Sequence, residues 1–544
     1  MNLQCGVRVG RHSERKGKVR MSRKKALDPT TYSKGELTGF LVGLAGQNII
    51  YNIIATGLTF YFQSVIFIPA MACSVIFAVA RVWDAINDPM MGSIVDKTRT
   101  KWGKCKPYLM FVPPVILVTT ILPFVNGMYA WPDGSGGSIL APLGSRVLIV
   151  AWAAISYILW GMTYTIGDIP LWGVTSLMTE NQNDRAKALS LARICASFGV
   201  IGMAFTFIAP AFKGLFLAKG MDEAHALRGA YILTAVILTV ISTILFEVAG
   251  LTVHERVSQS SESHSMKENF QTMWRCRPFR QLLISGVLRS PIQLLSLVAM
   301  TLVMYYFFNN DLGGTLMTEN GVNFSMIIKV VMLFIGIMGG MLVSSGVTPS
   351  LTRRFEKKTL YNAYSLFGAI PFALVFLIYK LAHGNLLGWP MTILISFVFF
   401  IASWAQGGLN VLQSVMIADC VDYEDYNNGI RPDGVFFAGQ SFITKLSAGI
   451  ASLISGAVYA IVGFSGENVA VLNADLLKGA DFTTYAGGKY AAAMFFLVSV
   501  PPALGMILSA MPTLRYALPD ADHNRILDEL QKRRHGAAQK DENL

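Results

Sequence analysis

The sequence contains a series of apolar segments of about 20 residues or more, separated by short polar stretches. Roughly 20 apolar residues are needed for a helix to cross the hydrocarbon core of a bilayer. Because lipid offers no hydrogen bonds to an exposed backbone, such segments must be helical. We predict twelve membrane-spanning helices, at residues 38–62, 68–95, 108–126, 146–176, 189–213, 229–250, 281–308, 324–347, 359–380, 388–418, 436–463 and 488–512. The predicted fold class is therefore an all-α membrane protein.

The composition agrees with this class and excludes several kinds of site. Hydrophobic residues make up 53% of the chain and charged residues 14%, with a mean hydropathy of +0.48, which is far more apolar than a soluble domain. The seven His all lie outside the apolar segments, and the six Cys are scattered without a CxxC pair. We therefore expect no haem, no His-based metal centre or proton relay, no zinc site and no disulfide framework.

A polar connector between the sixth and seventh predicted helices divides the chain into two sets of six. The loops DKTRTKWGK and TPSLTRRFEKK occupy equivalent places in the two sets, and both follow a glycine. Duplicated six-helix halves with a substrate site between them are a known transporter architecture. The predicted divisions are an N-terminal tail at 1–37, a first bundle at 38–250, the connector at 251–280, a second bundle at 281–512 and a C-terminal tail at 513–544.

Lysine and arginine are distributed unevenly between the two sides of this arrangement. With both termini cytoplasmic, 33 of the 45 basic residues fall on the cytoplasmic side and 7 on the other, as the positive-inside rule requires for a protein of the inner membrane. The net charge of +12 then reflects topology and not nucleic-acid binding. The N-terminal tail lacks the apolar region of a signal peptide. Met21 opens a more ordinary sequence, so residues 1–20 are a candidate over-extended start.

The second predicted helix carries charges that a membrane helix would normally avoid. Asp84 and Asp88 are four residues apart and share one helix face, and intramembrane ionisable groups are functional candidates. Together with Asn87 and with Thr165 on the fourth helix, they offer oxygen ligands for sodium or a shared proton. The alternative is that Arg81 simply neutralises Asp84 in a buried pair.

Other polar residues within the predicted helices suit a sugar. Asp168 and Trp172 share one face of the fourth helix, so that a carboxylate can bind hydroxyls while an indole packs on a pyranose. The Trp is otherwise a packing residue or an interfacial anchor. Arg193 is either a sugar contact or a purely structural partner of Asp168. Lys445 is a mid-span partner for the acidic cluster, unless it reaches an interface. Arg289 is a weaker candidate.

The polar run DCVDYEDYNNGIRPDGVFF, at residues 419–437, is predicted to be a cytoplasmic loop between the tenth and eleventh helices. Its acidic groups fit a hinged gate that pairs with the basic loop DKTRTKWGK. A plain solvated loop is the alternative. The predicted gate residues are Asp96, Lys97, Arg99, Asp419, Asp422, Glu424 and Arg431.

Four separated parts of the chain resemble one family. The segments WDAINDPMMGSIVDKTRTKWGKCKP, ADCVDYEDYNNGIRPDG and DIPLW, together with Lys445, are similar to the glycoside-pentoside-hexuronide:cation symporters of the major facilitator superfamily, over roughly residues 38–530. The resemblance implies two six-helix halves and cation-coupled sugar uptake by alternating access, with no cofactor besides the coupling ion. It implies a sodium ion or proton at Asp84 and Asp88, beside Asn87 and Thr165.

At the substrate end the resemblance is incomplete. It implies sugar contacts from Asp168, Trp172 and Arg193, with Lys445 between the two sites. Melibiose-transporting members carry a Lys-Asp pair where this chain has Gln47 and Asn48, and a Trp where it has Asn410. Without an acid at residue 48, less repulsion opposes an anionic substrate. An acidic glycoside and a neutral glycoside or pentoside both remain open.

The predicted function is therefore cation:sugar symport by a monomer in the lipid bilayer. The alternative within transporters is a uniporter, or a carrier of a lipid-like solute, on the same scaffold. An enzyme is disfavoured because the sequence contains no HExxH, no GxSxG and no nucleotide-binding glycine loop.

Overall fold

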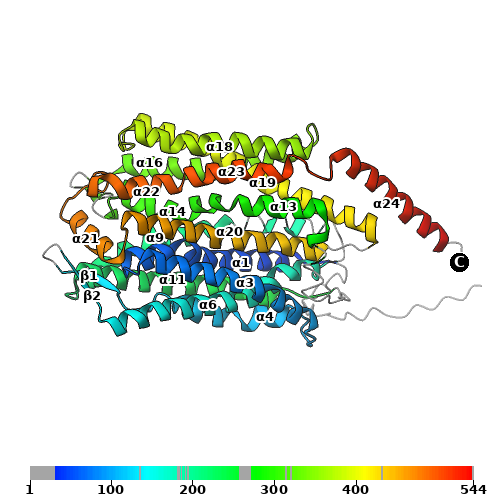
Figure 1. Ribbon diagram of the computed structural model, residues 1–544. Coiled ribbons are helices and arrows are strands. Elements are labelled where there is room, and N and C mark those ends of the chain that lie inside the picture. Colours follow the sequence, from blue (N-terminus) through cyan, green and yellow to red (C-terminus); the bar gives the residue numbers. More distant parts are fainter. Residues whose placement is uncertain are drawn as a thin grey trace, which may run out of the picture.

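The computed structural model describes residues 31–541 apart from short gaps. The gaps are 134–136, 180–183, 185–186, 190, 193–194, 196, 257–270, 272, 313–314, 316, 319–320 and 430–432. Within the described part, ten helices are long and apolar enough to cross a membrane. They lie side by side along one direction as a bundle (Figure 1). The predicted all-α membrane class is confirmed.

The first half runs from α1 to α11. Its elements are α1 (Lys34–Asn52), η1 (Ile53–Gly57), α2 (Leu58–Phe60), η2 (Tyr61–Val65), α3 (Ala70–Lys97), α4 (Lys106–Phe111), α5 (Pro113–Ile121), β1 (Ala130–Pro132), β2 (Ser138–Leu140), α6 (Leu143–Gly173), η3 (Val174–Ser176), η4 (Ser197–Gly199), α8 (Val200–Met203), α9 (Phe205–Ile208), η5 (Ala209–Phe212), α10 (Lys213–Leu217) and α11 (Glu223–Thr252). The strands β1 and β2 pair antiparallel.

The second half begins after the connector. Its elements are α13 (Arg277–Leu288), η6 (Ser290–Gln293), α14 (Leu294–Leu302), η7 (Val303–Phe307), β3 (Met317–Thr318), β4 (Gly321–Val322), α16 (Phe324–Phe334), η8 (Ile335–Gly339), α17 (Gly340–Leu351), α18 (Lys357–Leu381), α19 (Trp389–Asn428), α20 (Asp433–Val462), α21 (Gly466–Leu477), η9 (Tyr485–Gly488), α22 (Lys489–Leu497), α23 (Val500–Thr513) and α24 (Asp520–Asp541). The strands β3 and β4 also pair antiparallel.

Two predicted spans do not correspond to any of the ten long apolar helices of the described part. The span at 108–126 consists of α4 and α5, with Pro113 at the start of the second helix, where proline fits the first helical turn. The span at 189–213 includes residues outside the described part, and its described remainder consists of short helical pieces up to Leu217.

The polar run at 419–437 differs from its prediction as a loop. Helix α19 continues through it as far as Asn428, and Gly429 ends the helix in the left-handed conformation at φ 67°. Glycine adopts this backbone without strain. The acidic residues between Asp419 and Asp425 therefore lie on α19. This helix extends beyond the apolar stretch that defined the predicted span.

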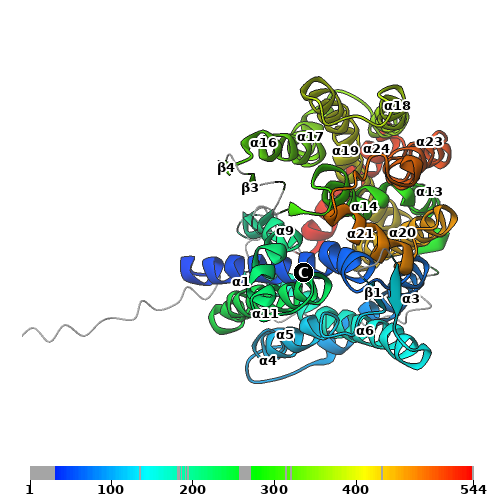
Figure 2. The same ribbon diagram turned by 90° about the vertical axis from the view of Figure 1, so that its left-hand side faces the viewer.

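Viewed along the bundle, α1, α3, α6 and α11 gather on one side, and α14, α18, α19 and α23 on the other (Figure 2). The first helix of each half has the same irregular end. The helix that begins with α1 ends in the π-helical turn η2, and the helix that contains α14 ends in the π-helical turn η7. The residues that follow, Phe67 and Asn309, both have positive φ, at 61° and 49°. This shared distortion supports an internal duplication.

The two halves contact each other at the end that carries α21. Asn473 of α21 donates to the backbone oxygen of Ser64 at 2.9 Å and accepts from the Tyr305 hydroxyl at 2.8 Å. A Cβ at Gly466 would lie 1.9 Å from the backbone oxygen of Phe67, so this contact requires glycine.

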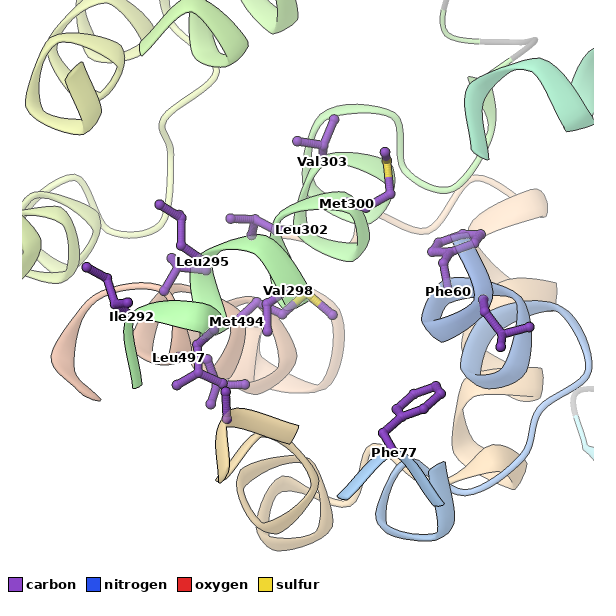
Figure 3. Close-up of a cluster of buried hydrophobic side chains, with 14 of the residues drawn as sticks. Phe60, Phe77, Ile292, Leu295, Val298, Met300, Leu302, Val303, Met494 and Leu497 are labelled. Carbon is purple, nitrogen blue, oxygen red and sulfur yellow. The ribbon is translucent and has the colours of Figure 1, made fainter. Parts of the chain in front are cut away.

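One buried apolar cluster contains residues of both halves (Figure 3). Its members include Phe60 and Phe77 from the first half and Leu295, Val298 and Met494 from the second.

Candidate cation and sugar site

Charged side chains on α3 are held by the neighbouring helix α6. Arg81 donates to the Asp84 carboxylate at 3.0 Å and, through its other terminal nitrogen, to the hydroxyl of Tyr157 at 2.9 Å. Asp84 is only 6% exposed. A Cβ at Gly161 would lie 3.0 Å from Asp84 Oδ1, so the bare backbone there lets the carboxylate pack against α6. The pair that the sequence offered as an alternative is present.

Asp88, one turn further along α3, has partners on two other helices. Lys445 of α20 forms an ion pair with its Oδ2, and Thr165 of α6 donates to its Oδ1 at 3.1 Å. Asn87 is 3% exposed, and its side-chain nitrogen has no hydrogen-bond partner among the described residues. Because α3 belongs to the first half and α20 to the second, the ion pair crosses the interface between the halves.

Asp168 of α6 is contacted by a residue of α1. Gln47 donates to Asp168 Oδ1 at 2.6 Å and also to the hydroxyl of Tyr164. Trp172 lies one turn further along α6 on the same face as Asp168, and Asn48 donates to the side-chain oxygen of Gln47 at 2.9 Å. Gln47 therefore contacts the predicted sugar-binding acid directly, and Asn48 adjoins it through Gln47.

An aromatic row on α6 adjoins this acid. Trp160 stacks on Tyr164 with ring centroids 5.0 Å apart, and Tyr157 stacks on Trp160 at 5.9 Å. The sequence analysis missed Trp160 and Tyr164. Their spacing could have revealed them, because they continue the four-residue spacing of Asp168 and Trp172 towards the start of the helix.

Two further predicted sugar contacts are Asn410 and Arg193. Asn410 has an exposed side chain on α19, whereas Arg193 lies outside the described residues. One turn after Asn410, Gln413 accepts a hydrogen bond of 2.5 Å from Arg289 Nη2. Arg289 is 7% exposed, and its Nη1 has no partner within the described part of the chain. The sequence offered this buried cation only as a weaker candidate.

The charges of the cluster nearly cancel. Arg81 balances Asp84 and Lys445 balances Asp88, whereas Asp168 forms no ion pair with a described residue. No group of three or more His, Cys, Asp and Glu side chains suited to a metal ion occurs in the described ranges. A hard cation would have the carboxylate and neighbouring amide and hydroxyl oxygens as ligands, and at Asp88 it must compete with the ammonium group of Lys445.

The acidic gate candidates on α19 pair within the second half. Lys357 at the start of α18 contacts Asp419 at 2.5 Å. His523 of α24 lies 3.6 Å from Asp419 and 3.2 Å from Asp422. Glu424 accepts a hydrogen bond from an amide one turn on. The sequence did not indicate that the C-terminal helix would supply a partner to this cluster.

The gate candidates of the first half lie at the end of α3 and in the loop that follows. Lys97 is exposed, and Arg99 donates to the Thr98 backbone oxygen at 3.0 Å. The side chain of Asp96 and the whole of Arg431 lie outside the described residues. A gate formed by these two groups of residues stays a prediction.

A carboxylate missed by the sequence analysis anchors this same loop. Glu255 accepts backbone hydrogen bonds from Lys104, Cys105 and Lys106 at 2.9, 2.8 and 2.7 Å, which caps the start of α4. Burial lowers the pKa of the Lys106 side chain, although the carboxylates of Glu36 and Glu255 oppose this shift. The loop is thereby fixed to the segment that follows α11.

Comparison with known proteins indicates the family to which the chain belongs. The chain is 24% identical over 433 residues to the "Glucuronide carrier protein homolog" of Escherichia coli (strain K12), covering 80% of this chain and 85% of that protein. It is 26% identical over 486 residues to the "Inner membrane symporter YicJ" of the same organism, covering 88% and 91%. The fold is similar to the inward-facing crystal structure of a bacterial homolog of the human lysosomal transporter Spinster, with a TM-score of 0.60 and 12% identity, covering 89% of this chain and 99% of that one.

Residues 39–520 match the family described as "MFS/sugar transport protein". This match covers both halves of the bundle and every described residue of the charge cluster. The predicted major facilitator fold and the prediction of a transporter in place of an enzyme are confirmed. The chain belongs to the MFS/sugar transport protein family and, within it, to the glycoside-pentoside-hexuronide:cation symporters.

Proposed function

We propose that the chain carries a sugar or glycoside together with sodium or a proton across the inner membrane by alternating access. The observation that carries the proposal is the ion pair between Asp88 and Lys445, which joins one half of the bundle to the other. A cation or proton bound at Asp88 takes over the role of Lys445. Binding at this one carboxylate thus changes an interaction between the two parts that must move.

Sugar binding is assigned to the neighbouring acid. Asp168 and Gln47 supply a carboxylate and an amide for hydroxyl groups, and Trp172 supplies a flat apolar ring. The proposed sugar contacts are Asn48, Asp168, Trp172, Arg193, Asn410 and Lys445, with Gln47 and Tyr164 added from the geometry. Asp84, Asn87, Asp88 and Thr165 form the proposed cation site.

Coupling follows from the position of Lys445 in this arrangement. If the cation binds best in the conformation that also favours sugar, each ligand raises the affinity for the other by the same factor. A released Lys445 ammonium needs a new acceptor, and we assign this role to Asp168, a carboxylate that forms no ion pair with a described residue. The cation therefore prepares the sugar site through Lys445.

The direction of opening follows from the distribution of basic residues. The bias of Lys and Arg supports cytoplasmic termini, so the α21 end would face away from the cytoplasm. The contacts of Asn473 close that end, and the site would then open towards the cytoplasm. Because one chain holds both proposed sites, the monomer is the proposed transport unit.

Among sugars, an acidic one is favoured by the environment of Arg289. A buried guanidinium without a carboxylate partner is unfavourable unless another anion approaches it. Within the described part of the chain Nη1 of Arg289 has no partner, so it is a donor for such an anion, and the similarity to a glucuronide carrier homolog supports the same class. A neutral glycoside or pentoside would leave this donor unused.

Uptake into membrane vesicles with imposed sodium or proton gradients tests the function. We expect accumulation of labelled sugar against its gradient, and Asp88→Cys should abolish this accumulation. Concentrative uptake by the Asp88→Cys variant would overturn the cation site. Exchange that persists unchanged after both ion gradients are dissipated, without any concentrative phase in the native chain, would support the uniporter alternative.

A further inference from the structure

An apolar groove opens on the outer surface of the second half, away from the proposed sites. It has about 380 Å³ of space and lies between α17, α18 and α19. The lining residues are Leu351, Phe355, Leu360, Ala363, Tyr364, Phe367, Gly368, Ile401, Trp404 and Ala405. These helices lie at the periphery of the bundle (Figure 2). The groove therefore faces the surroundings of the protein and not the interface between its halves.

Small residues form the floor of the groove. A Cβ at Gly368 would lie 2.6 Å from the Cβ of Ala405, so α18 and α19 approach closely there and leave a depression between larger side chains. Phe355 and Phe367 on its rim are 53% and 71% exposed. From Leu360 to Gly368 the groove follows α18 for about 12 Å. An apolar groove of this length fits an extended hydrocarbon chain.

Basic residues lie at one end of the groove. Arg353 and Arg354 are in the short connection between α17 and α18, beside Phe355, and both are exposed. Neither forms an ion pair with a residue in the described ranges. The adjacent Lys357 is already paired with Asp419 and Asp520. Two arginines that form no ion pair with a described residue thus lie where the apolar groove meets the end of the bundle.

We propose that this groove binds one anionic phospholipid, with an acyl chain between α18 and α19 and the phosphate group at Arg353 and Arg354. Basic residues next to a cleft between membrane helices are the chemistry that anionic headgroups select. The acyl chain of a zwitterionic lipid would also fit the groove, but its headgroup carries no net charge to balance the two guanidinium groups. Since α17, α18 and α19 belong to the second half, the bound lipid would hold three of its helices together.

Native mass spectrometry of the purified full-length chain tests the proposal, with phosphatidylglycerol, phosphatidylethanolamine or inorganic phosphate added in turn. We expect one retained phosphatidylglycerol per chain and weaker binding of phosphatidylethanolamine. Removing both charges in Arg353→Gln/Arg354→Gln should lower the affinity for phosphatidylglycerol by about thirtyfold. The matched control, Arg525→Gln/Lys532→Gln, removes two exposed charges of α24 at the same end and should leave that affinity unchanged.

A second variant separates the groove from the charges. Ala363→Phe fills the floor, so it should weaken binding of both lipids while the arginines remain. Equal affinity of the native chain for the two lipids, or unchanged phosphatidylglycerol binding by the double arginine variant, would overturn the proposal. Competition by inorganic phosphate as strong as that of the lipid would identify a free-anion site instead. A dimer that dissociates on Ala363→Phe substitution would assign the groove to a second copy of the chain.

Discussion

Lys445 of α20 forms an ion pair with Asp88 of α3, two residues 357 positions apart that belong to opposite halves of the bundle. Both side chains are partly exposed, at 24% and 22%, so water and ions reach the pair. Thr165 holds the other oxygen of the same carboxylate. The pair is therefore accessible to a competing cation, unlike the more enclosed pair of Arg81 and Asp84.

The double variant Asp88→Asn/Lys445→Gln should be more stable than either single variant. Each single change leaves one charge unpaired inside the bundle, which costs more than removing both. Partial exposure reduces this difference to roughly 1–2 kcal/mol. Thermal unfolding midpoints of the four proteins in detergent measure it. All three variants should lose gradient-driven accumulation, and additive effects on the midpoint would show that the two residues do not interact.

Gln47→Leu should weaken sugar binding without changing the dependence on the cation. The substitution removes a donor to the Asp168 carboxylate, and a hydrogen bond to a charged group contributes about 1.5–3 kcal/mol. We expect KM for the sugar to rise by roughly tenfold or more. Initial uptake rates over a range of sugar and cation concentrations measure both parameters. Thr56→Val, which removes a hydroxyl elsewhere on helix 1, is the control, and a matching loss there would contradict the assignment.

Gly466→Ala should open the closed end of the bundle. A methyl group at this position would meet the backbone oxygen of Phe67 at 1.9 Å, a clash that backbone atoms cannot relieve without movement. Reactivity of a cysteine introduced at Ser64 towards a membrane-impermeant reagent should increase. Gly346→Ala is the control because a Cβ there meets nothing within 4 Å. Equal reactivity in the two variants would mean that α21 does not seal this end.

The order and length of the helices could be predicted from the sequence because each long apolar run must form a helix in lipid. Prediction was wrong at residues 419–428, because a polar helix that extends beyond the membrane has the composition of a loop. The charged residues of the site could be predicted because a charged side chain within an apolar membrane segment is energetically unfavourable and therefore indicates a function. Uncharged partners such as Tyr164 were not predicted, because an aromatic side chain in an apolar segment does not by itself indicate a binding site.

Long-range partners were also beyond sequence reasoning. The pairing of Asp419 with His523 brings together α19 and the C-terminal helix α24, and no local pattern encodes that contact. Glu255 caps α4 across about 150 residues of chain. The pair of Asp88 and Lys445 was anticipated only because both charges required a partner within the membrane.

Arg289 provides the last prediction, which distinguishes acidic from neutral substrates. Its Nη2 is bound to Gln413, and its Nη1 has no hydrogen-bond partner among the described residues, so Arg289→Gln removes a buried charge that forms no ion pair with them. The variant should therefore keep or raise the unfolding midpoint while losing competition by uronides, and uptake of any neutral glycoside should persist. Arg289→Lys keeps the charge but not the fork of donors, and an intermediate effect is expected. Unchanged uronide competition in Arg289→Gln would assign the residue to helix packing and favour a neutral sugar.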